Sequence, residues 1–188
     1  MAALLLASGP VTAAGPRAYL DHLYFVIQGE VEETVPGTGN GFQTGAGIGI
    51  KGLVPVTQYL VFTGEAQAVE YHGGGSLGQV RLGAGLLARR SGVFVEYIKT
   101  DDALEAAGPA LHLRLGGRDL YAQVGYLSLD DRIETNTGYE YAAGFAAMVD
   151  GNLGAFFDVR HTALEGEDTG IKLVLTDFRI GLRFMFPR

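Results

Sequence analysis

The side chains of this chain with the widest chemical use are four histidines, His22, His72, His112 and His161. Ser76 falls in the same predicted link as His72, and Glu165 follows His161, so a hydrolase with a Ser/His or Asp/His arrangement is one hypothesis. A nucleophile, a base and an orienting group must meet in space, however, and isolated histidines in links are more often only solvated. The chain has no His-Glu-x-x-His spacing and no cysteine. We therefore predict no enzyme, no catalytic residue, no metal and no cofactor.

Charged residues that recur at alternate positions form a larger set, and each of them faces away from an apolar row. The acids are Glu30, Glu65, Glu96, Glu140, Asp158 and Asp177, and the bases are Lys51, Arg81, Arg114, Arg160, Arg179 and Arg183. If this face lines an enclosed lumen, these charges should pair in an interlocked network, because an unpaired buried charge is costly. The alternative is that they line a narrow, water-filled and weakly selective pore. The net charge of −7 argues against a nucleic-acid partner.

The element that must position these charges is clearest at the end of the chain, over Gly170–Arg188. A period of two indicates a strand, whose side chains point alternately to opposite faces. One face carries Asp177, Arg179 and Arg183. The other face is apolar, and we predict that it meets lipid through Phe178, Ile180, Leu182, Phe184 and Phe186. A long two-faced final strand is what a transmembrane β-barrel needs in order to close.

Similar alternating segments recur along the rest of the chain, with turn signals between them. They lie at about Tyr19–Glu32, Phe42–Val54, Tyr59–Tyr71, Leu77–Arg89 and Val93–Thr100, and then around Leu113, Val124, Ala143 and Phe157. No run of about 18 apolar residues predicts a transmembrane helix. The predicted fold is therefore all-β, an up-and-down antiparallel transmembrane β-barrel of about ten strands, with eight as the alternative. A soluble, lipocalin-like barrel that binds apolar ligands remains the competing interpretation.

The links between these segments differ in a regular way. Every second link is short, as at Pro55 and Asp150–Asn152, whereas most of the others are longer and acidic, as at Glu32–Asn40, Asp101–Gly108 and Asp130–Gly138. Because alternate links of an up-and-down barrel emerge at the same end, the pattern predicts one end of tight turns and one acidic, looser end. Both chain termini should then lie at the tight-turn end.

From about Ala18 to Phe186 the chain resembles small Gram-negative outer-membrane β-barrel proteins of the OmpA and OmpX type, and is similar to the YfaZ group. The shared features are the Phe-rich final strand, the tight turns and the outer loops. The resemblance implies a location in the bacterial outer membrane, contact with outer-membrane lipids and lipopolysaccharide, and insertion by the outer-membrane assembly machinery. That machinery reads a terminal aromatic residue, whereas here Pro187 and Arg188 follow Phe186. No motif specific to one function is matched.

The first residues form a separate segment. Residues 1–14 combine a short apolar core, a Gly-Pro break and small residues, which resembles the second half of a signal peptide without its positive n-region. We predict a signal-peptide remnant at 1–14 and a barrel domain at 15–188.

The sequence favours a structural or interaction role at the cell surface, with aromatic residues near the strand ends forming interfacial girdles. These aromatic residues are Phe42, Tyr97, Tyr126, Tyr139, Tyr141, Phe184 and Phe186.

Overall fold

The structure, a computed structural model, describes residues 18–33, 41–88, 90–102, 105–117 and 119–186. These residues form ten β-strands. The strands are β1 (Tyr19–Glu33), β2 (Gly41–Pro55), β3 (Leu60–Tyr71), β4 (Ser76–Leu87), β5 (Ser91–Asp102), β6 (Ala107–Gly116), β7 (Leu120–Asp130), β8 (Thr135–Met148), β9 (Leu153–Gly166) and β10 (Lys172–Met185). Within the described residues no helix is long and apolar enough to span a membrane.

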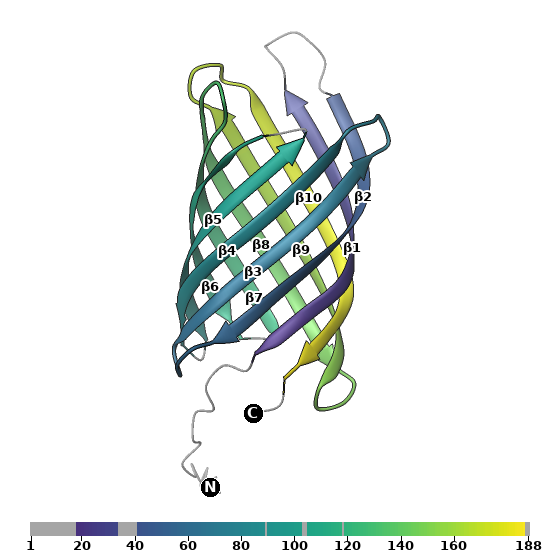
Figure 1. Cartoon of the computed structure of the whole chain (residues 1–188), viewed down its shortest axis with the longest axis vertical. Helices are drawn as coiled ribbons and strands as arrows, with labels where there is room; N and C mark the ends of the chain where they lie inside the picture. Colours follow the sequence, from purple (N-terminus) through teal and green to yellow (C-terminus); the bar gives the residue numbers. More distant parts are fainter. Residues whose placement is uncertain (1–17, 34–40, 89, 103–104, 118, 187–188) are drawn as a thin grey trace, which may run out of the picture.

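The strands form one closed barrel in which each strand pairs antiparallel with its neighbours in the sequence (Figure 1). Closure is made by β1 and β10, whose register runs from Tyr19 opposite Met185 to Glu33 opposite Lys172. Because the sheet closes on itself, no strand presents a free edge. The prediction of a ten-stranded up-and-down barrel closed by the final strand is confirmed.

Alternate links emerge at the same end of the barrel, as expected for an up-and-down topology. The start of β1 and the end of β10 lie at one end together with the links between β2 and β3, β4 and β5, β6 and β7, and β8 and β9, which we call the turn end (Figure 1). The opposite end, the loop end, carries the links between β3 and β4, β5 and β6, β7 and β8, and β9 and β10. The predicted signal-peptide remnant at 1–14 and the link at 34–40 lie outside the described residues.

The prediction of longer loops at Asp101–Gly108 and Asp130–Gly138 is wrong. Strand β5 continues to Asp102, and β8 already begins at Thr135. Backbone groups in these segments keep their sheet partners, as where Asp130 pairs with Thr135. Polar side chains marked these segments as loops in the sequence, but the strands continue as polar strands beyond the apolar part of the wall.

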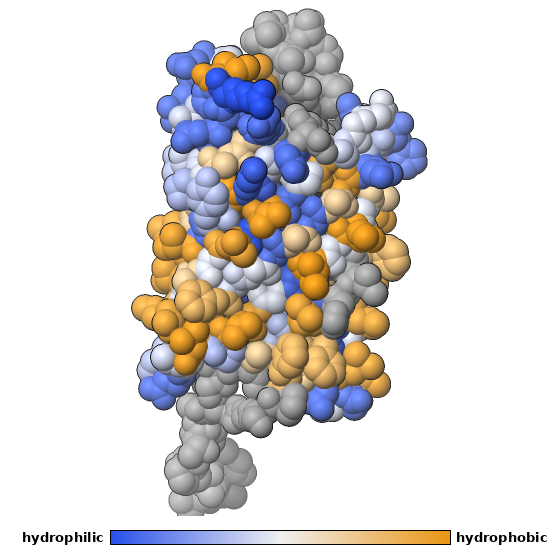
Figure 2. Space-filling model, in the orientation of Figure 1, coloured by the Kyte–Doolittle hydropathy of each residue, from blue (hydrophilic) through white to orange (hydrophobic). Residues whose placement is uncertain are grey.

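The outer surface of the barrel is apolar over most of its height. Figure 2 shows apolar side chains over the middle and turn-end part of the visible face, with hydrophilic side chains gathered at the loop end. Leu120 is 70% exposed and Ile27 is 61% exposed, and similar side chains recur on every strand. In a soluble barrel these rows would face inward, whereas here the charged rows do. This inversion is what a barrel wall needs in contact with hydrocarbon, so the soluble interpretation is not supported.

Most of the predicted girdle aromatics are on this outer surface. Tyr97, Tyr126, Tyr139 and Tyr141 are exposed, and the rings of Tyr126 and Tyr139 meet edge to face at 5.5 Å. Further along these strands toward the loop end the outward positions become polar, as at Lys99 and Asp130. The tyrosines therefore mark the border of the apolar band on β5, β7 and β8, where amphipathic rings are favoured. The side chain of Phe42 lies outside the described set.

The interior is layered along the barrel axis. At the turn end, inward side chains form an apolar cluster of Tyr19, Leu53, Val61, Phe94 and Met185. Near the loop end a second cluster contains Ile98, Ala106, Ala110, Leu127, Leu129 and Leu164. A third contains Val69, Tyr71, Leu77, Ala146, Phe156 and Leu175, and Leu173 packs against both the second and the third. The charged residues occupy the middle of the lumen between the end clusters.

Candidate functional site: the charged lumen

Every predicted lumen charge whose side chain is described lies inside the barrel. Ten of the side chains described are at most 9% exposed or closely ion-paired in the interior: Lys51, Glu65, Arg81, Arg114, Glu140, Asp158, Arg160, Asp177, Arg179 and Arg183. Glu96 also faces inward and contacts Arg81 and His112. The side chain of Glu30 lies outside the described set. On the opposite face Phe178, Ile180, Leu182 and Phe186 are exposed, and Phe184 is half-buried against the ring of Phe186.

Glu140 is the centre of the network. Its carboxylate accepts two parallel hydrogen bonds from Arg81, at 3.0 and 2.6 Å, and a third from the Thr162 hydroxyl at 3.1 Å. Arg160 Nε and His112 Nε2 lie 3.5 and 3.2 Å from its Oε1 atom. Since Glu140 is 1% exposed, these contacts replace the water that a free carboxylate would hold.

Glu65 joins this centre to the closing strand. It accepts two hydrogen bonds of 2.8 Å from Arg160, and Arg179 Nη1 lies 3.2 Å from its Oε1 atom. Arg179 in turn donates to Asp177 at 2.5 Å. The forked geometry of arginine fits carboxylates in this two-point manner, which fixes direction as well as charge. The pairs join β3, β9 and β10, so the network sets which strands face one another across the lumen.

Asp21, Lys51 and Asp158 connect the turn end to the same network. Arg183 donates to Asp21 at 2.6 and 2.8 Å, and Lys51 lies 3.6 Å from the same carboxylate. Lys51 also donates to Asp158, whose Oδ2 atom accepts a hydrogen bond of 3.1 Å from Tyr121. A chain of ion pairs therefore runs from β1 through β2 and β9 to β10.

Asp21 is a network member that sequence reasoning missed. A strict period of two places it on the outward face with Phe25 and Ile27. The pairing of β1 shifts register between residues 21 and 25, as at a β-bulge, so Asp21 faces inward and is fully buried whereas Phe25 faces outward. The sequence gives one hint of this bulge: strict alternation would place the charged side chain of Asp21 on the apolar face.

His112 is the second residue that the predicted network omitted. Its ring is fully buried, with Nδ1 3.3 Å from Glu96 and Nε2 3.2 Å from Glu140. The ring lies over Gly125, its cross-strand partner, at a position where any Cβ atom would collide with the imidazole. The alternation of His112 with leucines did place it on the inner face, but only the pairing of β6 with β7 shows why a glycine stands opposite.

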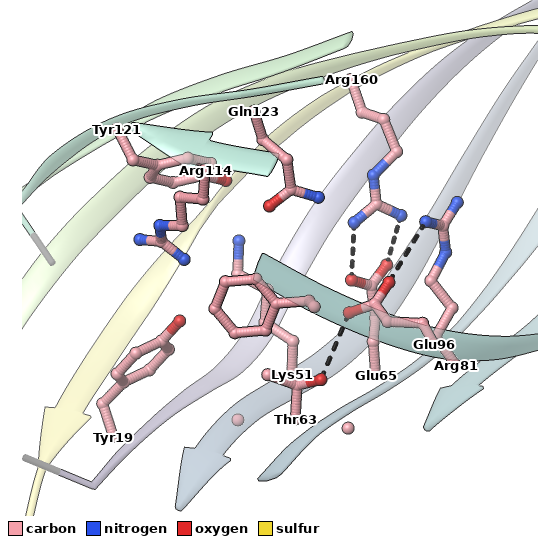
Figure 3. Close-up of a pocket in the computed structure, with 13 residues that line it drawn as sticks. Tyr19, Lys51, Thr63, Glu65, Arg81, Glu96, Arg114, Tyr121, Gln123 and Arg160 are labelled. Carbon is pink, nitrogen blue, oxygen red and sulfur yellow. Dashed lines mark hydrogen bonds and ion pairs between the residues drawn. The ribbon is translucent and has the colours of Figure 1, made fainter. Parts of the chain in front are cut away.

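Arg114 differs from the other lumen bases. It is 8% exposed, stacks on Tyr121 with its guanidinium carbon 4.0 Å from the ring centre, and donates to the Gly117 carbonyl at 3.0 Å. Its Nε has no hydrogen-bond partner, and among the described residues no carboxylate lies within ion-pair distance of it. Arg114 borders a cavity of about 60 Å³ in the turn-end half of the lumen, shown in Figure 3.

The histidines of the hydrolase hypothesis lie apart from this network. His72 is exposed in the β3–β4 link. His161 lies on the outer surface of β9, where its Nδ1 is 2.9 Å from the Thr176 hydroxyl, and Glu165 is paired with Lys172 further along the strand. Apart from the Thr176 hydroxyl, no side chain of the described residues forms a hydrogen bond with either ring. The acidic and histidine side chains of those residues also form no cluster able to hold a metal ion.

At the loop end, one carboxylate ties two links together. Glu134 accepts hydrogen bonds from the backbone N–H groups of Asp168 and Thr169, at 2.8 and 2.9 Å, and from the Thr169 hydroxyl at 2.5 Å. The Thr169 hydroxyl and these N–H groups lower the pKa of Glu134. In the same link, the N–H groups of Glu134 and Ile133 hold the pKa of Asp131 below its ordinary value. The ionised form of each carboxylate is thus the one that orders these links.

The comparisons with known proteins show a similarity in fold alone. No protein family model and no curated protein matches the chain. Among solved structures, Neisserial surface protein A is 12% identical, with a TM-score of 0.46, 90% of this chain and 97% of that chain covered. The KdgM porin is 11% identical (TM-score 0.43; 86% and 99% covered), and Ail of Yersinia pestis is 14% identical (TM-score 0.37; 90% and 100% covered).

The fold and the two faces of its wall define the class of protein. A closed, even-stranded antiparallel barrel with an apolar exterior, a charged interior and its first and last strands paired is a small transmembrane β-barrel of the bacterial outer-membrane type. The prediction of this class is confirmed. The narrower similarity to the YfaZ group and the signal-peptide remnant stay predictions.

Proposed function

We propose that the chain is a closed outer-membrane barrel with a structural or interaction role at the bacterial cell surface, rather than a pore. The observation that supports this most is the filling of the lumen. Paired guanidinium and carboxylate groups cross the middle of the barrel, and apolar clusters occupy the interior toward both ends. A hydrated ion would have to displace the paired charges and the apolar clusters in order to pass.

Two features favour the competing function, a small weakly selective pore. The cavity beside Arg114 is partly open and polar, and six inward acids in the described residues (Asp21, Glu65, Glu96, Glu140, Asp158, Asp177) balance six bases (Lys51, Arg81, Arg114, Arg160, Arg179, Arg183). A cavity of about 60 Å³ holds a few water molecules, and it does not amount to a channel through the barrel. We therefore rank closure above conduction.

Single-channel recording in planar bilayers tests the proposal. Protein refolded in detergent, with folding checked by heat-modifiable migration on a gel, is expected to give no stable conductance steps. The double variant Glu65→Ala/Arg160→Ala removes the pair that crosses the lumen and serves as the opened comparison, in which steps should appear. Reproducible steps from the unmodified protein, of uniform size, would overturn the closed-barrel proposal.

We further propose that the barrel contacts outer-membrane lipids and lipopolysaccharide and is inserted by the outer-membrane assembly machinery. The apolar band supports the lipid contact, and the acidic loop end supports an association with lipopolysaccharide phosphates through divalent cations. Folded protein in bilayers that contain lipopolysaccharide should lose thermal stability when calcium is removed. An equal loss in bilayers without lipopolysaccharide would contradict the bridging role.

A further inference from the structure

One base of the lumen, Arg114, has no described carboxylate within ion-pair distance. Each described carboxylate of the interior lies within ion-pair distance of a base other than Arg114: Asp21 and Asp158 with Lys51, Glu65 with Arg160, Glu96 and Glu140 with Arg81, and Asp177 with Arg179. Arg114 has only a backbone carbonyl and the face of a tyrosine ring. A guanidinium that is more than nine-tenths buried without a counter-charge is costly, unless something outside the chain supplies one.

The surroundings of Arg114 form a built cavity rather than a packing defect. The cavity is lined by four bases, Lys51, Arg81, Arg114 and Arg160, and by two acids, Glu65 and Glu96; Figure 3 shows that the two acids are turned toward Arg160 and Arg81. Gln123 is the cross-strand partner of Arg114, and no described residue forms a hydrogen bond with its amide. The tyrosine that stacks on Arg114 is itself fixed by its hydrogen bond to Asp158, at 3.1 Å. The guanidinium is therefore held in place at the edge of the cavity.

We infer that this cavity is a binding site for a small oxyanion, held by Arg114 and Gln123. A guanidinium offers N–H donors in a plane that suits phosphate, sulfate or carboxylate oxygens. Gln123, on the neighbouring strand, lines the same cavity, and its amide can add one more donor when the NH₂ group is turned toward Arg114. The cavity of about 60 Å³ has room for a small anion. This inference goes beyond the proposed structural role, since a closed barrel and a pore could each hold such an anion.

Inorganic phosphate is the probe, titrated into the folded protein in detergent at constant ionic strength kept with chloride. The readout is the nuclear magnetic resonance signal of the Arg114 Nε–H group, the donor that has no partner. The signal is identified by its loss in Arg114→Gln. We expect it to shift and saturate with phosphate, and Gln123→Ala should weaken the affinity by about tenfold or less, the range of one lost hydrogen bond.

The matched control is Arg90→Gln, which removes an exposed arginine at the same end of the barrel and should leave the titration unchanged. If Arg114→Gln does not fold, the Nε–H signal is assigned in the unmodified protein by through-bond correlation along the Arg114 side chain, so the test does not depend on that variant. An Arg114 Nε–H signal that does not move with phosphate, or that moves equally with chloride alone, would overturn the site. Conductance is recorded separately, so a failure here is distinguishable from a failure of the closed-barrel proposal.

Discussion

Replacing Glu140 with glutamine should destabilise the barrel more than any other single loss of charge in the lumen. The carboxylate holds two hydrogen bonds from Arg81 and lies beside Arg160 and His112, in a site 1% exposed. Glutamine keeps the volume but replaces one acceptor oxygen by an NH₂ group that faces other donors. Arg81 then loses its hydrogen-bonded counter-charge while it stays buried, whereas Arg160 keeps its pair with Glu65.

The expected cost follows from the burial of the pair. Removing one partner of a buried ion pair typically costs about 3–5 kcal/mol, because the remaining charge stays buried and uncompensated. At 1.36 kcal/mol for each factor of ten, the unfolding equilibrium constant should rise by roughly a hundredfold to a few thousandfold. A lumen filled with water would screen the same charges and reduce the cost toward the value of about 1 kcal/mol or less seen for surface pairs.

The assay is urea unfolding in lipid vesicles, with the folded fraction measured by gel migration of unheated samples, since the chain has no tryptophan to report by fluorescence. The matched control is Glu165→Gln, which changes an exposed carboxylate paired with Lys172 and should stay within about 0.5 kcal/mol of the parent. If Glu140→Gln unfolds at the same urea concentration as Glu165→Gln, the network does not carry the stability argued above.

Three further outcomes follow from the described contacts. The folded-state pKa of Glu134 is lowered, so its ionised carboxylate should order the neighbouring loop above the ordinary carboxyl pKa and release the loop as the pH falls through the lowered value. Amide exchange should detect this transition, and Glu134→Gln should abolish it. Gly125→Ala should lower the midpoint of unfolding because its methyl group meets the imidazole ring, whereas Gly117→Ala, with nothing within 4 Å, should not. Leu182→Arg should cost about 2–4 kcal/mol in a bilayer and Thr176→Arg, toward the loop end of β10, about 1 or less; equal costs would contradict the assigned depth.

Much of the wall of the barrel could be predicted from the sequence, because strand alternation is a local property. Charged residues alternate with exposed apolar ones on β10, so both faces were assigned before any pairing was known. The layered interior was not predicted, since Leu53 and Phe94 are apolar residues that alternate with other apolar residues. A period of two cannot tell which row of such a strand meets lipid.

The candidate site was predictable in its members but not in its partners. Arg160 and Glu65 are 95 residues apart, and their meeting depends on the registers of several strands. The register shift in β1 moved Asp21 into the lumen against the simple alternation. Arg114 belonged to the predicted set of charges, but that it lacks a carboxylate follows only from where every other charge points.

The most direct test of the account uses the absence of cysteine in the chain, since one introduced cysteine can carry a single nitroxide label. Labels at Phe178 and Leu182 should collide with oxygen, which partitions into lipid, and hardly at all with a water-soluble nickel chelate. A label at Gly151, in an exposed turn, should show the reverse. We expect the excess of oxygen collisions over nickel collisions to be larger at Leu182, near the middle of the apolar row of β10, than at Phe178. Nickel collisions at Leu182 as frequent as at Gly151 would contradict a lipid-facing wall and with it the membrane barrel itself.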